Sequence, residues 1–286
     1  MKAKKLLTLL PVLALAACGG AKSLDQAQAT ERANAILAAQ GEITETPSTY
    51  QVVEHAFYQD TLVDGTVEEQ EFTNTTTVAE NYVSFRQVYH YAGGEETIDQ
   101  DLSVWCYVKD AKLTLAFSVD GEGEYLQMDV PEGVEVPAEA LDANVAGVMG
   151  EESVVSEFDL SFFFNSTVLE GISNLYDEEV IEYMGFTTYE ITAKSTGEGN
   201  LTLAVDATMN EEMDLGEYGG VVTLTGEIKE SYSWNNNLFT KYVSEMTTTA
   251  TNAEGTSTSI VNDDTTVNYS VKAVYPDLSK FEQATA

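Results

Sequence analysis

From residue 49 onward, hydrophobic and polar side chains alternate in short runs, and this period of two limits the possible folds more than any other feature. Between residues 113 and 119, for example, four apolar side chains alternate with Thr114, Ala116 and Ser118. Such alternation places the two kinds of side chain on opposite faces of a β-strand. Turn-forming pairs such as Asp64-Gly65 separate the runs. The sequence therefore predicts a mainly β protein made of antiparallel hairpins.

The predicted strands fall into two blocks, one before residue 131 and one after residue 179. The expected strands are 49–62, 66–78, 80–91, 96–108, 111–119 and 123–130, followed by 180–194, 200–208, 218–233, 238–252 and 257–275. Many of these runs exceed the usual strand length. We therefore expect a tall sheet that is strongly twisted or curved.

Two helical segments accompany the strands. Ser23 is a candidate N-cap for a helix from Leu24 to about Ala39. A helical insert at about 137–176, with Pro137 as its first residue, separates the two blocks of strands. The expected fold class is α+β, mainly β: a long curved antiparallel sheet, an unclosed half-barrel, with the N-terminal helix and the insert covering its concave face.

The first 18 residues have the pattern of an export signal. Lysines among residues 2–5 precede an apolar run from Leu6 to Leu15, which is too short to span a bilayer. The end of this run, Leu15-Ala16-Ala17-Cys18, resembles the lipobox of bacterial lipoproteins. This resemblance implies cleavage before Cys18, acylation of its thiol, and lipid anchoring to a cell membrane or outer membrane, facing outside the cytoplasm. The alternative is a soluble secreted protein that is cut at the same place.

These features predict the organisation of the whole chain. Residues 1–17 form the signal peptide and 18–22 a lipidated tether, followed by one β-rich domain, 23–281, and a short tail, 282–286. The mature chain then has 10 basic and 48 acidic residues, a net charge of about −38. Such a charge repels phosphate backbones and anionic lipid headgroups. We therefore expect no nucleic-acid partner and a body that the tether holds off the membrane.

Residue types used in catalysis and metal binding are few. His55 and His90 fall in predicted strands with no second His or Cys nearby, which favours ordinary strand residues over metal ligands. The acidic runs Asn262-Asp263-Asp264 and Asp177-Glu178-Glu179 do not fit a calcium loop, and we interpret them as solvated turns. Known nucleophile and phosphate-loop motifs are missing from the sequence. We therefore expect no enzyme activity, no cofactor and no metal, although a pair of acids facing one another is compatible with the composition.

Cys106 is expected to be a small buried hydrophobic residue, because it lies within a strand pattern. If the sulfur of Cys18 carries lipid, no disulfide bond can form within the mature chain.

The order of the elements resembles that of the LolA and LppX/LprG-type lipoprotein carriers. These proteins have an N-terminal helix, an unclosed curved sheet with helices inserted between its strands, and a similar ending, here Tyr275-Pro276-Asp277-Leu278. The resemblance implies a cavity for acyl chains between sheet and helices, and a role in transferring or sensing lipids or lipoproteins. The length and acidity of this chain argue against lipid transfer at an anionic membrane.

We therefore expect a membrane-anchored, non-enzymatic lipoprotein that binds or carries a hydrophobic small molecule or lipid. The side chains expected to line its pocket are Phe158, Phe162, Phe163, Phe164 and Trp105. The alternative is an acidic surface adhesin or structural spacer of the cell envelope with no ligand cavity. An apolar cavity of several hundred cubic ångströms favours the carrier over the spacer.

Overall fold

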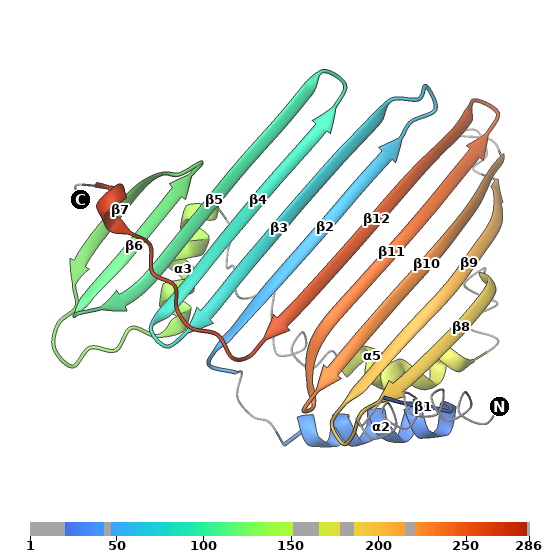
Figure 1. Ribbon diagram of the computed structural model, residues 1–286, viewed down its shortest axis with the longest axis horizontal. Coiled ribbons are helices and arrows are strands. Elements are labelled where there is room, and N and C mark those ends of the chain that lie inside the picture. The colour runs from blue at the N-terminus through green and yellow to red at the C-terminus, as the bar shows by residue number, and fades with distance from the viewer. Residues whose placement is uncertain (1–20, 43–46, 151–165, 178–185, 215–220, 285–286) are drawn as a thin grey trace, which may run out of the picture.

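The computed structural model describes residues 21–42, 47–150, 166–177, 186–214 and 221–284. Its strands form one open sheet of 13 strands, in the order β1-β8-β9-β10-β11-β12-β2-β3-β4-β5-β6-β7-β13 (Figure 1). Neighbouring strands are antiparallel, except that β13 runs parallel to β7. The expected α+β, mainly β fold with an unclosed sheet is confirmed.

The two predicted blocks of strands lie side by side in this sheet, because β12 pairs with β2 along most of its length. The first block contains β2 (Tyr50–Thr61), β3 (Val67–Ala79), β4 (Tyr82–Gly93), β5 (Glu96–Lys109), β6 (Lys112–Val119) and β7 (Glu122–Asp129). The second contains β8 (Phe186–Ser195), β9 (Leu201–Asp214), β10 (Val221–Asn235), β11 (Leu238–Asn252) and β12 (Gly255–Asn268). Two very short strands, β1 (Lys22–Leu24) and β13 (Glu282–Gln283), occupy the edges.

The sheet has two ends, defined by where the hairpin turns lie. The turns at 80–81, 110–111, 196–200 and 236–237 lie at the end near helix α2 (Gln26–Gln40), which we call the α2 end (Figure 1). The turns at 62–66, 94–95 and 253–254 lie at the opposite, distal end. Residues with positive φ form the tightest turns, among them Asp120-Gly121 and Asn236-Asn237.

Helices pack on one face of the sheet, which we call the helix-bearing face. Helix α3 (Ala138–Met149) contacts β4, β5 and β6, and α2 contacts β1, β8 and β9 together with the short helix α5 (Ser166–Glu170) and the 3₁₀ turn η1 (Gly171–Tyr176). Fully buried side chains fill both contacts. At α3 they include Leu141, Val145, Val83, Val104 and Cys106, and at α2 Ala29, Ala33, Ile36, Leu201 and Leu203.

The N-terminal helix begins two residues later than predicted. Its N-cap is Asp25, whose carboxylate accepts a hydrogen bond from the backbone N–H of Gln28, while the Gln28 side chain accepts one from the backbone N–H of Asp25. This reciprocal capping box stabilises the first turn of the helix. The prediction of Ser23 as N-cap was wrong, because Ser23 lies in strand β1, where it pairs with Lys194 of β8.

The helical insert is described only in part. Helix α3 matches its predicted first half, with Pro137 just before the helix rather than inside it. Residues 151–165 and 178–185 lie outside the described residues, and with them Phe158, Phe162, Phe163 and Phe164.

The C-terminal segment leaves the sheet earlier than predicted. Strand β12 ends at Asn268, although the alternating pattern continues to Tyr275. Beyond it, the chain crosses the face opposite the helices (Figure 1), where Tyr275 packs edge-on against Tyr82 and Tyr107. The alternation persists because these residues pack against other strands of the same sheet. The single predicted strand 257–275 was therefore wrong in its last third.

Candidate functional site

The helix-bearing face carries a row of apolar side chains, which lies closer to the distal end of the sheet than the helix contacts do. The strand register places one residue from each of nine neighbouring strands, β8 to β5, at the same level. Eight of these nine are apolar or aromatic; Gln70 of β3 is the polar one. We call the eight the apolar row: Tyr189, Ala207, Ile228, Met246, Val261, Tyr58, Tyr91 and Ile98.

The apolar row is only partly covered. Tyr58 and Ile98 are 36% and 41% exposed, and Ile228, Met246 and Val261 are half-buried. The main contacts of α3 are with β4 to β6 and those of α2 with β1, β8 and β9, so the central strands β10, β11, β12, β2 and β3 lie between the two described helical contacts. The row spans about 38 Å across the strands, at roughly 4.8 Å per strand spacing.

On the strands from β10 to β4, polar side chains separate the apolar row from the buried core. Glu230 accepts hydrogen bonds from the hydroxyls of Tyr232 at 3.1 Å and Tyr242 at 3.4 Å. Further along, the Asn74 amide donates to Glu54 and accepts from Gln87, each at 3.0 Å. These strands thus change from apolar to polar and back to apolar on one face.

Burial shifts the protonation of this polar layer toward its neutral forms. Burial raises the pKa of Asp263, and the nearby Asp264 carboxylate adds to the effect, while the hydroxyl of Thr265, 3.2 Å away, opposes it. Burial likewise raises the pKa of the Tyr232 and Tyr242 hydroxyls, and the neighbouring Glu230 raises both further. The tyrosines therefore stay neutral hydrogen-bond donors at physiological pH. Asp263 lies within strand β12 rather than in a turn, so the predicted solvated turn at 262–264 was wrong.

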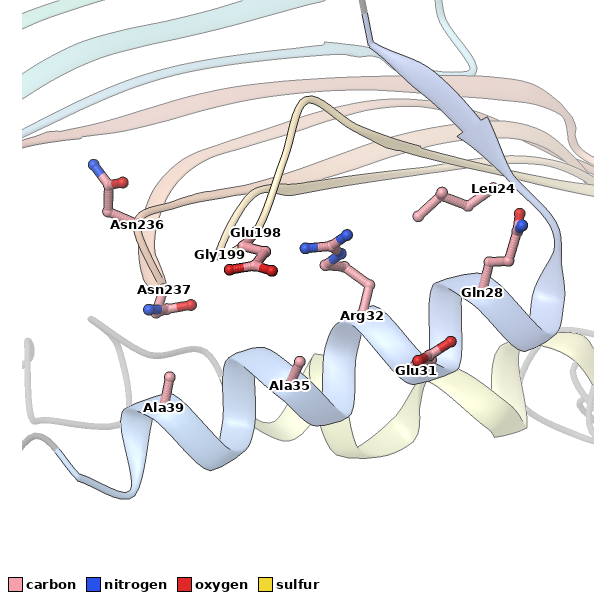
Figure 2. Close-up of a pocket in the computed structure, with 10 residues that line it drawn as sticks. All are labelled: Leu24, Gln28, Glu31, Arg32, Ala35, Ala39, Glu198, Gly199, Asn236 and Asn237. Atoms are coloured by element: carbon pink, nitrogen blue, oxygen red, sulfur yellow. The ribbon is translucent and has the colours of Figure 1, made fainter.

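A cleft of about 630 Å³ lies at the α2 end, between helix α2 and two hairpin turns (Figure 2). Arg32 of α2 points toward the β8–β9 turn, where its Nη1 donates a hydrogen bond to the Gly197 carbonyl at 2.8 Å. Gly199 in this turn has φ +71°, and a Cβ there would meet the Asn237 side chain at 2.7 Å, so glycine is needed for the two turns to approach. The lining is mixed: the turns contribute polar groups, and helix α2 contributes two alanines together with Gln28, Glu31 and Arg32.

The opposite face holds a smaller groove of about 370 Å³ beside the C-terminal segment. Trp105 lines this groove and packs on Phe281, with 5.9 Å between ring centroids. Arg86 pairs with both oxygens of Asp101 at 3.0 and 2.7 Å, and this bidentate contact raises the pKa of Arg86 and lowers that of Asp101. The structure therefore places Trp105 on the face opposite helix α3, the described first half of the helical insert.

Both histidines lie on the same face as Trp105 and contact carboxylates. His55 Nε2 is 2.8 Å from Glu71 Oε1, and His90 Nδ1 is 2.7 Å from Asp99 Oδ1. Within the described residues, no group of three or more His, Cys, Asp or Glu side chains is arranged to hold a metal ion. Cys106 is fully buried and free, as predicted, and burial raises the pKa of its thiol to about 12.

Alternation within each strand indicates which of its residues share a face, but not which residues of different strands lie level. The apolar row was missed for this reason, because it depends on the register of nine strands.

Among the residues that the structure describes, no helix is long and apolar enough to cross a membrane. No protein-family model and no curated protein sequence matches the chain.

Proposed function

We propose that the mature protein is an extracytoplasmic lipoprotein, anchored through Cys18, whose helix-bearing face binds a hydrophobic small molecule or lipid without catalysing a reaction. The observation that carries the binding proposal is the apolar row, which crosses nine strands at one level. Complete burial of an aliphatic or aromatic side chain contributes roughly 1.5–3 kcal/mol. A half-exposed side chain has gained only part of this free energy, and a bound apolar ligand would supply the rest.

The polar layer beside the row supports an amphiphilic ligand in particular. A hydrocarbon chain lying along the row would cover apolar side chains from several strands. A polar head could then donate hydrogen bonds to the Glu230 carboxylate, or to the hydroxyl oxygens of Tyr232 and Tyr242, whose own protons already point to Glu230. Half-buried hydrogen-bonding groups next to apolar surface are the arrangement that fixes the orientation of such ligands.

Native mass spectrometry of the mature chain from Gly19 onward, purified from cells without detergent, tests the binding proposal. We expect bound lipid-sized masses, and Met246→Ser and Val261→Thr should reduce their occupancy. The matched controls are Thr247→Ser and Ile260→Thr, which change the neighbouring residues on the opposite face of the same two strands. No bound mass in any variant, or equal losses on both faces, would reject the proposal.

Labelling of the whole chain in cells with an alkyne fatty acid tests the anchor separately. Wild-type protein should acquire the label and Cys18→Ala should not. Labelling that survives Cys18→Ala would place the lipid elsewhere, and an unlabelled wild-type chain would remove the anchor from the proposal.

The second candidate is an acidic spacer or adhesin that projects from the cell envelope. The length of the strands favours it, because the 15 residues of β10 or β11 extend about 50 Å at 3.3 Å per residue. For this candidate, the purified chain carries no bound lipid, and substitutions in the apolar row change only stability.

A further inference from the structure

Under the proposed anchoring, the distance from the lipid to the folded body is very short. Only Gly19, Gly20 and Ala21 separate Cys18 from Lys22, the first residue of β1. Four residue steps reach at most about 14 Å even when fully extended. The membrane surface must therefore lie close to Lys22 in the assembled protein, and the tether is too short to hold the body off the membrane, contrary to the expectation from net charge alone.

Lys22 is fixed at the α2 end of the sheet. It pairs with Ser195, the last residue of β8, next to the β8–β9 turn. Helix α2 begins four residues after Lys22 and runs along the same end of the sheet (Figure 1). The distal end of β10 lies about 50 Å farther along the strands, which is well beyond the reach of the tether.

The distribution of charge agrees with this position. From the level of the apolar row out to the distal end, the described segments contain no lysine or arginine (residues 58–70, 91–98, 186–189, 207–214, 221–228 and 246–261). The same segments contain many acidic residues: Asp60, Asp64, Glu68, Glu69, Glu95, Glu96, Glu211, Glu212, Glu227 and Glu254. Anionic lipid headgroups repel such a surface within a Debye length.

The α2 end, by contrast, carries basic side chains around the start of the tether. Lys22 and Lys194 lie on the paired strands β1 and β8, and Arg32 lies on the adjacent helix α2. Acidic residues such as Asp25, Glu31 and Glu198 are also present, so this region is close to neutral rather than positive. An end with mixed charge can lie against lipid headgroups, whereas the distal end would be repelled.

We infer that the part of the α2 end formed by β1, α2 and the β8–β9 and β10–β11 turns faces the lipid headgroup surface, and that the acidic hairpins at the distal end project away from it. This inference rests on the proposed anchor at Cys18 and specifies which surface of the protein meets the membrane. It also places the cleft of Figure 2 next to the bilayer.

Contact-range fluorescence quenching on the full lipidated chain tests the inference. The variants Glu198→Cys, Glu254→Cys and Glu212→Cys each exchange one exposed glutamate for a labelling site, so their change in charge is the same. Glu198 lies in the β8–β9 turn at the α2 end, and Glu254 lies in the distal β11–β12 turn. Glu212 lies near the distal end of β9, close to the lateral edge of the sheet that carries β1 and the anchor. The thiol of Cys106 is buried and should stay unlabelled. The wild-type chain, which has no introduced cysteine, is the control for this background labelling.

The labelled proteins are reconstituted into phosphatidylcholine–phosphatidylglycerol vesicles that carry a nitroxide on the lipid headgroup. We expect the label at position 198 to be quenched several-fold more than the labels at 254 and 212. Equal quenching, or strongest quenching at 254, would overturn the inference. Strongest quenching at 212 would also overturn it, since the lateral edge of the sheet that carries β1, and not the α2 end, would then face the membrane.

Flotation of the same vesicles separates this result from failure of the anchor. Protein that does not float with the vesicles and lacks acyl mass on its N-terminal peptide refutes the anchor and, with it, the orientation. Protein that floats but is not quenched at 198 refutes the orientation alone.

Discussion

Ala111 has a backbone conformation that alanine rarely adopts. Its φ is +57° and that of Asp110 is +53°, in the two-residue turn between β5 and β6. The left-handed conformation brings Cβ close to the following carbonyl oxygen and costs an L-residue roughly 1 kcal/mol or more. The corresponding turns at Asp120-Gly121 and Asn236-Asn237 use residue types that tolerate positive φ. The β5–β6 turn is therefore locally strained.

Replacing Ala111 with glycine should relieve this strain. We expect Ala111→Gly to raise the free energy of unfolding by about 0.5–1 kcal/mol, since the gain exceeds the added entropy of glycine in the unfolded chain. Urea unfolding measures the change. Ala253→Gly is the matched control: Ala253 is also an exposed turn alanine but does not have positive φ, so its replacement should give no gain. A similar gain in both variants would contradict the explanation by strain.

His90 makes stability depend on pH. Its hydrogen bond to Asp99 is the main cause of its raised pKa, and the nearby Glu71 and Glu69 carboxylates add to the shift. A histidine whose pKa is higher in the folded than in the unfolded state stabilises the fold fully below the unfolded value of about 6.5, and this contribution is lost as pH rises through the folded pKa.

We therefore expect His90→Gln to lower stability below about pH 6, relative to wild type, and to have little effect near pH 9. Denaturant unfolding at several pH values measures the difference. Asp99→Asn should reduce the same pH-dependent difference, and the double variant should lose little more than either single variant. A deficit of constant size at all pH values would show that the ion pair is not its source.

At the level of secondary-structure elements, α3 depends on its contact with the sheet. Leu141 and Val145 are completely buried against β4 and β5, whereas Val148 on the same helix is 39% exposed. Leu141→Ala should destabilise the protein by about 2–4 kcal/mol, because it removes buried methyl groups and leaves a cavity. Val148→Ala is the control and should change stability by less than about 0.5 kcal/mol. Thermal and urea unfolding measure both; comparable losses would mean that α3 is not held by its buried side.

Most hairpins could be predicted from the sequence because their signals are local. Alternation marks each strand, and pairs such as Asp120-Gly121 mark where the chain reverses. Helix boundaries were less certain, because Ser23 and Asp25 are both good N-caps and only the pairing of β1 with β8 excludes Ser23. The end of β12 was missed because Tyr275 keeps the strand periodicity while packing against Tyr82 and Tyr107.

At the scale of the whole molecule, sequence patterns do not determine how distant strands combine. The pairing of β12 with β2 joins residues about two hundred positions apart, and nothing local in either strand specifies it. The apolar row and the distal region without basic residues both result from this long-range arrangement. The same arrangement separates charge along the strands, since the row containing Lys229 is the most distal one with a basic residue.

This separation of charge predicts an unusual response to salt. The ion pairs among the described residues are largely exposed, and such pairs contribute little to stability. Repulsion among distal carboxylates should therefore dominate the salt dependence. Raising ionic strength from about 0.01 M to about 0.15 M shortens the Debye length from about 30 Å to about 8 Å, so the repulsion weakens and Tm should rise.

Calorimetry of the chain from Gly19 at pH 8 measures this rise, with about 2–4 °C expected for each kcal/mol of relieved repulsion. Two substitutions at the distal side of the sheet should change it in opposite directions. Glu212→Gln removes a negative charge and should reduce the increase in Tm, whereas Lys229→Gln removes the most distal cation and should enlarge it. A Tm that falls with salt would show that ion pairs such as Arg86–Asp101 outweigh the repulsion. In that case the acidic hairpins would no longer be a net source of instability, and their charge would affect only how the protein approaches other surfaces.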